Sequence, residues 1–495
     1  MGKFKNTEPS QGLILAVNLK DQIIEGSFEH TLSVLFEKDK IDLSKLILKY
    51  HNDVIGRKAY NPKILLKIIL FAYYKGITSS REIEIACNKN LTFMALAENE
   101  KPDHSTIANF VSSMDKEVKD IFEQVVLICF ELGLIKSGTL AIDGCKISSN
   151  ASKEWSGTIS ELESKKSKIK AKIREIMEEH KNSDPDENNF KRIDKLDKKM
   201  EKITDFLANN EKKMGKRNHE KQSNITDNDS SKMKTSHGVI QGYNGVAVAD
   251  SENQIIVEAE AFGEGQEYDL LKPMIEGAEK IINQMNRKIS DTKILADNGY
   301  FKESNLEYLA EKKIDAYIPD QNARKRDPKF KTRDRHREEK NPREYKRYIE
   351  KDFTYVSEKD EYICPNGESL NRWGGFTNGH SYGRRYGTKK ASCSACPLKS
   401  NCISENQDRR ELNIYDGVNV PETEKMREKI DSKEGRKIYS KRMSIIEPVF
   451  GNIRFNKGLD YFSLRTKAKV NIQWLLWCMV HNIEKIVTKG KFNLL

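Results

Sequence analysis

Two short hydrophobic stretches, far apart in the chain, each lead into an aspartate that is closely followed by glycine. In the first, four apolar or β-prone residues precede Asp143 and Gly144; in the second, a similar run precedes Asp297, and Gly299 follows. We predict that each stretch is a buried strand that delivers one acid to its end, where the chain turns away. Carboxylates at the ends of neighbouring buried strands are how a fold makes a site for hard divalent cations.

The length and charge of the chain narrow its class. With 495 residues it is too long for one simple core, so we expect two to four folded units. The net charge of +11 indicates a polyanionic partner such as DNA or RNA, although charge alone does not distinguish nucleic acid from a membrane surface.

The sequence also bears on the cellular setting. No apolar run approaches the ~20 residues that a membrane span needs, and the N-terminus has no apolar signal region. We therefore expect a cytoplasmic protein without membrane contact. In a reducing compartment its eight cysteines would be thiols or metal ligands rather than disulfides.

The first part of the chain, residues 28–135, is predicted to be helical. Pro62 begins one helix, apolar residues at helical spacing continue it, and Gly76 ends it. Short helices joined by tight turns are typical of a helix-turn-helix DNA reader. A small helical bundle gives the same pattern, and pattern alone slightly favours the bundle.

Two charged stretches, Glu161–Lys181 and Phe190–Met214, are dense in lysine and glutamate with a thin apolar stripe. We predict an antiparallel helical hairpin whose mixed charges form a solvated face. Residues 238–320 return to strand and helix patterns: two strands joined by the turn Asp250–Asn253, a helix, the Asp297 strand, a second helix and a last strand. A mixed sheet flanked by helices is the expected result.

Residues 321–350 are strongly basic and contain few apolar residues. The run begins with Arg324, Lys325 and Arg326, which we predict to contact DNA. Such a segment is predicted to be mobile until it binds phosphates. A solvated loop without a partner explains the same composition equally well.

Four cysteines follow in a loop-rich stretch: Cys364, the pair Cys393 and Cys396 in a Cys-x-x-Cys pattern, and Cys402. Four thiolates can bind Zn²⁺ as a closed structural site. The spacing is irregular, and reduced thiols in a loop-rich insertion are the alternative. We favour a zinc site over reduced thiols, because a small segment with little apolar content needs a metal ion or another cross-link to be stable.

A third acid, Glu447, stands in the stretch Tyr439–Gly451. Pro448 restricts Glu447, so we expect the helix to kink here or to restart at Pro448. If the helix recovers, Arg454 lies two turns beyond Glu447 on the same face. A carboxylate backed by cations suits a site that holds metal ions against a phosphate backbone. Taken alone, Glu447 would be an ordinary helix-surface acid.

From about residue 28 to residue 487 the chain resembles bacterial insertion-sequence transposases, which have a DDE catalytic core with an RNase H-like fold. In that family the first aspartate ends the first strand, and Asp143 matches it. The second aspartate ends the fourth strand, and Asp297 matches it within Ala-Asp-Asn-Gly-Tyr. The resemblance therefore assigns two of the three catalytic acids.

The family's glutamate lies on a late helix within a Tyr, Arg, Glu, Lys signature, which Tyr439, Arg442 and Glu447 fit. Arg454 stands at the place of the lysine and keeps its charge. One extra residue separates Arg442 from Glu447 relative to the commonest spacing. We predict that four residues of this region contact DNA: Tyr439, Lys441, Arg442 and Arg454. For the three cations, the alternative is that they form ion pairs with nearby acids.

The resemblance implies cleavage at transposon ends and strand transfer into target DNA by in-line displacement at phosphorus. Two Mg²⁺ ions, or Mn²⁺, would activate the attacking oxygen and stabilise the leaving one. Asp143 would bridge both ions, while Asp297 and Glu447 would each hold one. Water attacks first and the freed 3′-hydroxyl then attacks target DNA, so no covalent protein nucleophile is needed.

Two other functions fit the same pattern. One is a related nuclease that cuts but does not join; the other is a non-catalytic DNA-binding protein derived from a transposase, against which the intact set of three acids argues. The implied partners are double-stranded DNA, at the terminal inverted repeats and at the target, and a second copy of the chain when two ends are synapsed. The implied location is the bacterial cytoplasm, at the nucleoid.

The predicted organisation has four parts. Residues 1–137 form a helical, DNA-binding domain. An RNase H-like α/β core with a mixed sheet is formed by residues 138–157, 236–320 and 421–490. The core is split by the charged hairpin insertion, residues 158–235, and by the basic and cysteine-bearing insertion, residues 321–420.

Overall fold

The computed structural model describes residues 16–50, 58–136, 138–180, 187–215, 219–330, 347–378, 381–404, 406–418 and 421–490. The fold is mixed α/β with a helical N-terminal region, as predicted. It divides into two compact units: Met1–Thr292 with Met443–Leu495, and Lys293–Arg442. None of the helices in the described ranges combines the length and the apolar character that a membrane-spanning helix requires.

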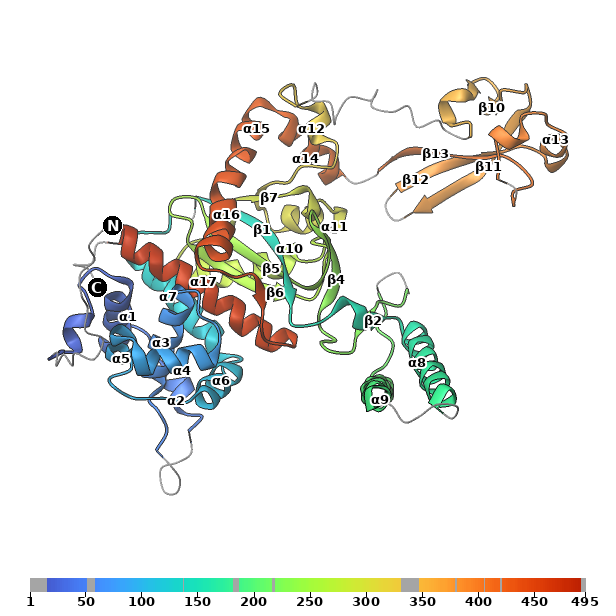
Figure 1. Ribbon diagram of the computed structural model, residues 1–495. Helices are drawn as coiled ribbons and strands as arrows, with labels where there is room; N and C mark the ends of the chain where they lie inside the picture. Colours follow the sequence, from blue (N-terminus) through green and yellow to red (C-terminus); the bar gives the residue numbers. More distant parts are fainter. Residues whose placement is uncertain are drawn as a thin grey trace, which may run out of the picture. The chain divides into compact units, whose positions relative to one another are not determined.

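The N-terminal part of the first unit consists of helices (Figure 1). They are η1 (Lys20–Gln22), α1 (Phe28–Glu37), α2 (Ser44–Ile47), α3 (Pro62–Tyr74), α4 (Ser80–Lys89), α5 (Leu91–Leu96), α6 (His104–Ser113) and α7 (Glu117–Glu131). α3 begins at Pro62 behind Asn61, whose side chain accepts a hydrogen bond from the Lys63 N–H. Gly76, with φ +76°, follows its end in the left-handed conformation that glycine favours. Both predicted ends of this helix are confirmed.

The long C-terminal helix α17 (Lys467–Lys489) organises the core of the first unit (Figure 1). It packs against α1, α3, α7 and strand β6 (Ile256–Phe262). Trp474 and Trp477 are fully buried in this core, so neither ring is available to stack on a base. Asn482 accepts from the Ile256 N–H and donates to the Ile256 carbonyl, both at 2.8 Å. This asparagine satisfies backbone groups of β6 that would otherwise be buried without a partner.

His481 is a buried titratable group on α17. Its Nε2 donates to the Gln254 carbonyl at 2.9 Å, so Nδ1, which lies 3.1 Å from Asn452 Nδ2, is the acceptor of a neutral ring. Burial lowers the pKa of His481 to about 4. The neutral ring is therefore favoured in the folded state, and its contribution to stability is present above the unfolded pKa of about 6.5.

We predict that the folded chain loses about 3 kcal/mol of this contribution as the pH falls from about 6.5 toward 4. Urea unfolding of wild type and of His481→Gln at pH 7.5 and pH 4.5 measures it. The glutamine variant should show a smaller loss of unfolding free energy between the two pH values. Equal losses in the two proteins would contradict the prediction.

The sheet of the first unit is built on β1 (Thr139–Ser149) and β5 (Gly238–Asp250), which pair antiparallel. On its opposite edge β5 pairs with β4 (Ser231–Thr235) and with β6, and the end of β1 pairs in parallel with β14 (Tyr461–Phe462). The predicted hairpin at Asp250–Asn253 is confirmed as β5–β6. The helix predicted after it is α10 (Leu271–Gln284), followed by η3 (Ile289–Asp291).

The predicted charged hairpin is α8 (Ile159–His180) and α9 (Glu187–Asn209). The start of α8 packs on the end of α9 through Leu162, Ile203 and Phe206, and Ile173 near the end of α8 packs on Ile193 near the start of α9. The two helices are therefore antiparallel, as predicted. The short η2 (Lys153–Trp155) precedes β2 (Ser156–Gly157), which pairs with β3 (Ser223–Asn224).

In the second unit, β7 (Lys293–Ala296) and β8 (Asp315–Tyr317) pair in parallel, with η4 (Asn298–Tyr300) and α11 (Glu303–Glu311) between them. This is the predicted strand, helix, strand order. Short helices follow in the chain: α12 (Ala323–Arg326), η6 (Glu350–Asp352), α13 (Lys390–Ser394), η7 (Lys399–Asn401), α14 (Pro421–Asp431) and α15 (Lys433–Tyr439). Of the basic stretch, residues 331–346 lie outside the described residues, so its predicted mobility is untested.

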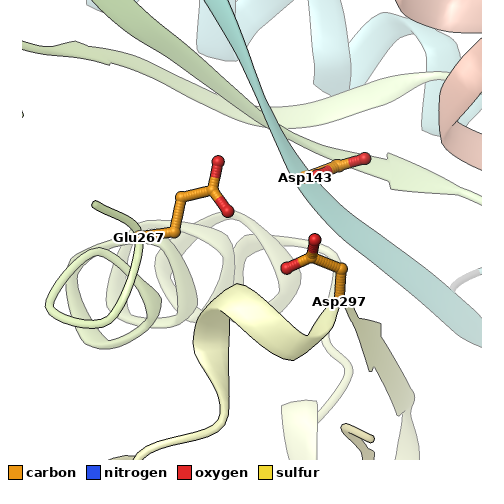
Figure 2. A group of neighbouring side chains, drawn as sticks. All are labelled: Asp143, Glu267 and Asp297. Carbon is orange, nitrogen blue, oxygen red and sulfur yellow. The ribbon is translucent and has the colours of Figure 1, made fainter. Parts of the chain in front are cut away.

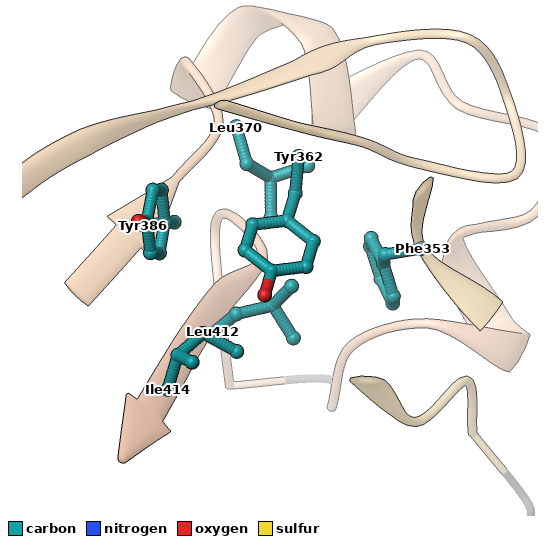
Figure 3. Packing of buried hydrophobic residues seen from close by; sticks show 6 residues of the cluster. All are labelled: Phe353, Tyr362, Leu370, Tyr386, Leu412 and Ile414. Carbon is teal, nitrogen blue, oxygen red and sulfur yellow. The ribbon is translucent and has the colours of Figure 1, made fainter. Parts of the chain in front are cut away.

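The second unit also contains a five-stranded antiparallel sheet that sequence patterns did not reveal. Its order is β13-β12-β11-β10-β9, with bounds β9 (Thr354–Val356), β10 (Glu361–Ile363), β11 (Ser369–Asn378), β12 (Ser381–Gly387) and β13 (Glu411–Val418). A small core covers it, formed by Phe353, Tyr362, Leu370, Tyr386, Leu412 and Ile414 (Figure 3). The cysteine-bearing segment therefore has an apolar core of its own, although a small one.

Candidate metal site

Asp143 lies inside β1, which runs on to Ser149, so the prediction that the strand ends at this acid is wrong. Gly144 stays in the ladder opposite Val246 and makes no turn. The glycine is needed for space instead: a Cβ on Gly144 would lie 2.5 Å from Asn244 Oδ1 and 2.8 Å from Glu267 Oε1. A side chain here would displace the groups beside Asp143.

Asp297 directly follows β7, as predicted. It caps η4, because its Oδ1 accepts a hydrogen bond from the Gly299 N–H at 2.7 Å. The glycine in the Asp-Asn-Gly pattern thus fixes the orientation of the carboxylate at the strand end. One of its oxygens is held by the backbone, and the carboxyl group remains half-buried.

Three carboxylates come together: those of Asp143, Asp297 and Glu267. Each offers an oxygen, and these oxygens all lie within 4.8 Å of one another (Figure 2). Glu267 stands between β6 and α10, and its Oε1 accepts from Asn244 Nδ2 at 3.2 Å. The structure therefore brings together the two predicted aspartates and adds a glutamate that sequence reasoning missed.

The surroundings of this group fit a hard divalent cation. Asn244 is fully buried beside Glu267, and its Oδ1 has no hydrogen-bond partner among the described residues. Three half-buried carboxylates at such short range repel one another unless positive charge lies between them. Carboxylate and carboxamide oxygens are ligands that Mg²⁺ and Mn²⁺ prefer.

Glu447 is placed differently from the two aspartates. It lies exposed on α16 (Lys441–Gly451), and the group of three close carboxylates does not include it. Pro448 lies inside α16, so the helix does not restart there as one of the two expectations had it, and it passes into π-helical turns, η8 (Asn452–Asn456). Proline has no N–H for the Ser444 carbonyl, and Gln254 Nε2 donates to that carbonyl at 3.0 Å instead.

Within the second unit, two residues of the predicted signature lie near Asp297. Burial raises the pKa of Tyr439, and the Arg442 guanidinium, which hydrogen-bonds to the phenol, acts in the opposite direction. The charge of Asp297 also contributes to this shift, so the three groups are within electrostatic reach of one another. Arg442 itself is buried, whereas Lys441 is exposed.

Within the first unit, Arg454 lies near the acids. Its Nη1 is 3.7 Å from Cys145 Sγ, and its Nε is buried without a hydrogen-bond partner among the described residues. Burial raises the pKa of the Cys145 thiol; Arg454 lowers it, while Asp143 and Glu267 raise it. A cation at the place of the signature lysine is therefore close to two of the three carboxylates.

The other predicted residues are distributed as follows. Arg324 and Lys325 are exposed on α12, where they are accessible to a polyanion. Arg326 forms ion pairs with Asp320 at 2.6 Å and with Asp431 at 2.5 Å. The four predicted zinc ligands, Cys364, Cys393, Cys396 and Cys402, all line one cavity.

Comparison with known proteins defines the class. Residues 17–113 match a transposase domain (DUF772), and residues 363–487 match a transposase DDE domain. The chain therefore contains two separate regions that are similar to transposase domains. Together the two matches support its membership of the insertion-sequence DDE transposases.

These matches have a defined extent. The DDE match contains Glu447 and the four cysteines but begins beyond Asp143 and Asp297. No curated protein matches the chain. At a general level the DDE family implies DNA binding, divalent-metal use and nuclease or transesterase activity, and the acidic group is compatible with metal use and with metal-dependent catalysis.

Proposed function

We propose that this transposase cleaves DNA at transposon ends and transfers the cut strands into target DNA by metal-dependent, in-line phosphoryl transfer. The observation that carries the proposal is the convergence of Asp143, Glu267 and Asp297 in a chain with two transposase-domain matches. The catalytic core is proposed to be RNase H-like, with the charged hairpin and the cysteine-bearing segment as insertions.

Asp143, Glu267 and Asp297 would hold Mg²⁺ or Mn²⁺ at this site. When bound, such ions supply Lewis-acid catalysis to displacement at phosphorus. The chain's own contribution is to position two of these carboxylates: Gly144 leaves room for Glu267, Asn244 donates a hydrogen bond to it, and the Gly299 N–H donates to Asp297. We also propose Glu447 as a further catalytic acid, because the family resemblance assigns it that role.

Cations near the acids are proposed to position the DNA backbone. Arg454 lies beside Cys145, near Asp143 and Glu267, and Arg442 lies beside Tyr439 near Asp297. A guanidinium near a metal-binding carboxylate group can donate two parallel hydrogen bonds to two oxygens of a phosphate, which orients the scissile group. Further phosphate contacts outside the site are proposed for Lys441, Arg324 and Lys325. Arg326 would make such a contact only after its ion pairs with Asp320 and Asp431 break.

Transposition requires two DNA ends, so we propose that two copies of the chain act together when the ends are synapsed. The proposed DNA partners are the terminal inverted repeats and the target. The helical N-terminal region, whose residues 17–113 match a transposase domain, is the proposed reader of the repeats.

A strand-transfer assay tests the proposed function. Pre-cut DNA ends, made from the sequence that flanks the reading frame, are incubated with the full chain, Mg²⁺ and a supercoiled target. We expect joined products and, with uncut ends, cleavage products. Cleavage without joining would replace the proposal by a nuclease, and binding without either reaction by a non-catalytic DNA-binding protein.

A further inference from the structure

We infer that Cys364, Cys393, Cys396 and Cys402 together hold one structural Zn²⁺ ion in the second unit. The four side chains line one cavity, although they come from separate parts of the chain: the turn after β10, the segment around α13, and the end of η7. This site does not depend on the proposed reaction, because it uses none of the residues that carry it.

The turn at Cys364 is shaped to present a sulfur as an acceptor. The chain turns over Cys364–Gly367, where the Gly367 N–H donates to the Cys364 carbonyl at 2.8 Å and Gly367 has φ +85°. The next N–H, that of Glu368, donates to Cys364 Sγ at 3.3 Å. The turn therefore fixes the position of this sulfur, and N–H groups directed at the sulfur are compatible with a metal-bound cysteine.

The other three cysteines are held by consecutive turns. The Cys396 N–H donates to the Cys393 carbonyl at 3.4 Å, and the Cys402 N–H donates to the Lys399 carbonyl at 3.1 Å. Thr388 Oγ1 lies 3.0 Å from Cys393 Sγ. The Cys-x-x-Cys pair and Cys402 are thus carried by one short, hydrogen-bonded stretch that closes over the Cys364 turn.

A positively charged side chain lies beside the four cysteines, because Arg410 lines the same cavity. Arg410 Nη1 donates to the Cys402 carbonyl at 2.9 Å, so a cation is fixed next to the thiols. Four thiolates carry more negative charge than one arginine offsets, and a divalent cation that accepts soft ligands would offset two further charges.

The sheet explains why a metal is needed here. Cys364 and Cys402 pack against the six-residue core of the β9–β13 sheet (Figure 3). Such a core buries little apolar surface, and small domains of this kind use metal or disulfide staples. Among the residues that the structure describes, the three carboxylates are the only group of three or more acidic, histidine or cysteine side chains with ligand atoms within 4.8 Å of one another, so the sulfurs must move closer together to bind Zn²⁺ at about 2.3 Å.

Metal analysis of the purified full-length chain tests this inference. We expect a single zinc ion per chain after dialysis against metal-free buffer, and the same content in Cys145→Ser, a matched control outside the second unit. Cys364→Ser and Cys396→Ser should lose it. Retention of zinc in both variants, or wild-type protein that takes up none when supplied with equimolar Zn²⁺, would overturn the inference.

Two further measurements guard against variants that fail to fold. Wild-type protein loaded with Co²⁺ should show the charge-transfer and ligand-field absorption bands of a tetrahedral thiolate site. The absence of these bands would count against four sulfur ligands. Thr388→Val removes only the hydroxyl beside Cys393 Sγ, and we expect the zinc affinity to fall about 10- to 100-fold. Disulfides between these cysteines in freshly purified protein would also overturn the proposal.

Discussion

Asp143→Asn is expected to cleave transposon-end DNA about a thousandfold more slowly than wild type, a loss of about 4 kcal/mol of transition-state stabilisation. Asparagine keeps the shape of the side chain but removes the charge that, with Glu267 and Asp297, forms the acidic group. Cleavage of a labelled DNA end under single-turnover conditions measures the rate. DNA affinity, measured separately by fluorescence anisotropy, should change little, because the cations that contact phosphate remain.

Asp291→Asn is the matched control for this experiment. Asp291 is an exposed acid of η3 in the same unit and is not part of the acidic group. Its substitution should leave the cleavage rate within about twofold of wild type, as expected for a surface position. If Asp143→Asn cleaved as fast as Asp291→Asn, the acidic group would not be the reaction centre.

Glu267→Gln is expected to weaken Mn²⁺ binding to the DNA-free chain by about 100-fold or more, because it removes one of three carboxylate ligands. Glu447→Gln should leave this affinity unchanged, because Glu447 lies exposed on α16 and outside the group. Titration of Mn²⁺ followed by the electron paramagnetic resonance of the free ion measures both affinities.

The same two variants distinguish the third acid that the structure indicates, Glu267, from the one that the family resemblance indicates, Glu447. The resemblance assigns the third catalytic acid to Glu447, so Glu447→Gln tests that role in DNA cleavage. Unchanged Mn²⁺ affinity in Glu267→Gln, together with a large loss in Glu447→Gln, would show that Glu267 is a bystander. Loss of cleavage in both variants would mean that the reaction needs both acids.

The sequence predicts elements well where a local signal sets them. Asn61, Pro62 and Gly76 define α3, and the turn at Asp250–Asn253 defines the β5–β6 hairpin. In each case the capping or turn residue acts on its own neighbours, so no tertiary information is needed. The strand-end position of Asp297 was found in the same way.

Gly144 was correctly singled out from the sequence, but the reason predicted for the glycine, a turn after the strand, is wrong. A glycine after an acid predicts a turn, yet β1 continues and the glycine serves the approach of Asn244 and Glu267. Those two residues are far from Gly144 in sequence, so no local pattern contains the contact. Glu267 was missed for the same reason, although it follows a strand as Asp297 does.

The β9–β13 sheet was missed because its signals are weak. Its inward residues are two tyrosines, two leucines, one phenylalanine and one isoleucine, scattered over a long stretch of chain, and several of its strands are short. Alternation over three residues, as in β9 and β10, is too brief to distinguish a strand from a loop. The four cysteines pointed to a structured segment here, but a thiol pattern does not reveal a sheet.

The most direct test of the central claim is to map the metal site on the polypeptide itself. With Fe²⁺ in place of Mg²⁺, ascorbate and peroxide generate hydroxyl radicals that cut the backbone close to the bound ion. We expect cuts of the full chain near residues 143, 267 and 297, which excess Mg²⁺ suppresses and which Asp143→Asn abolishes. Cuts confined to other regions, or an unchanged pattern in Asp143→Asn, would contradict this claim.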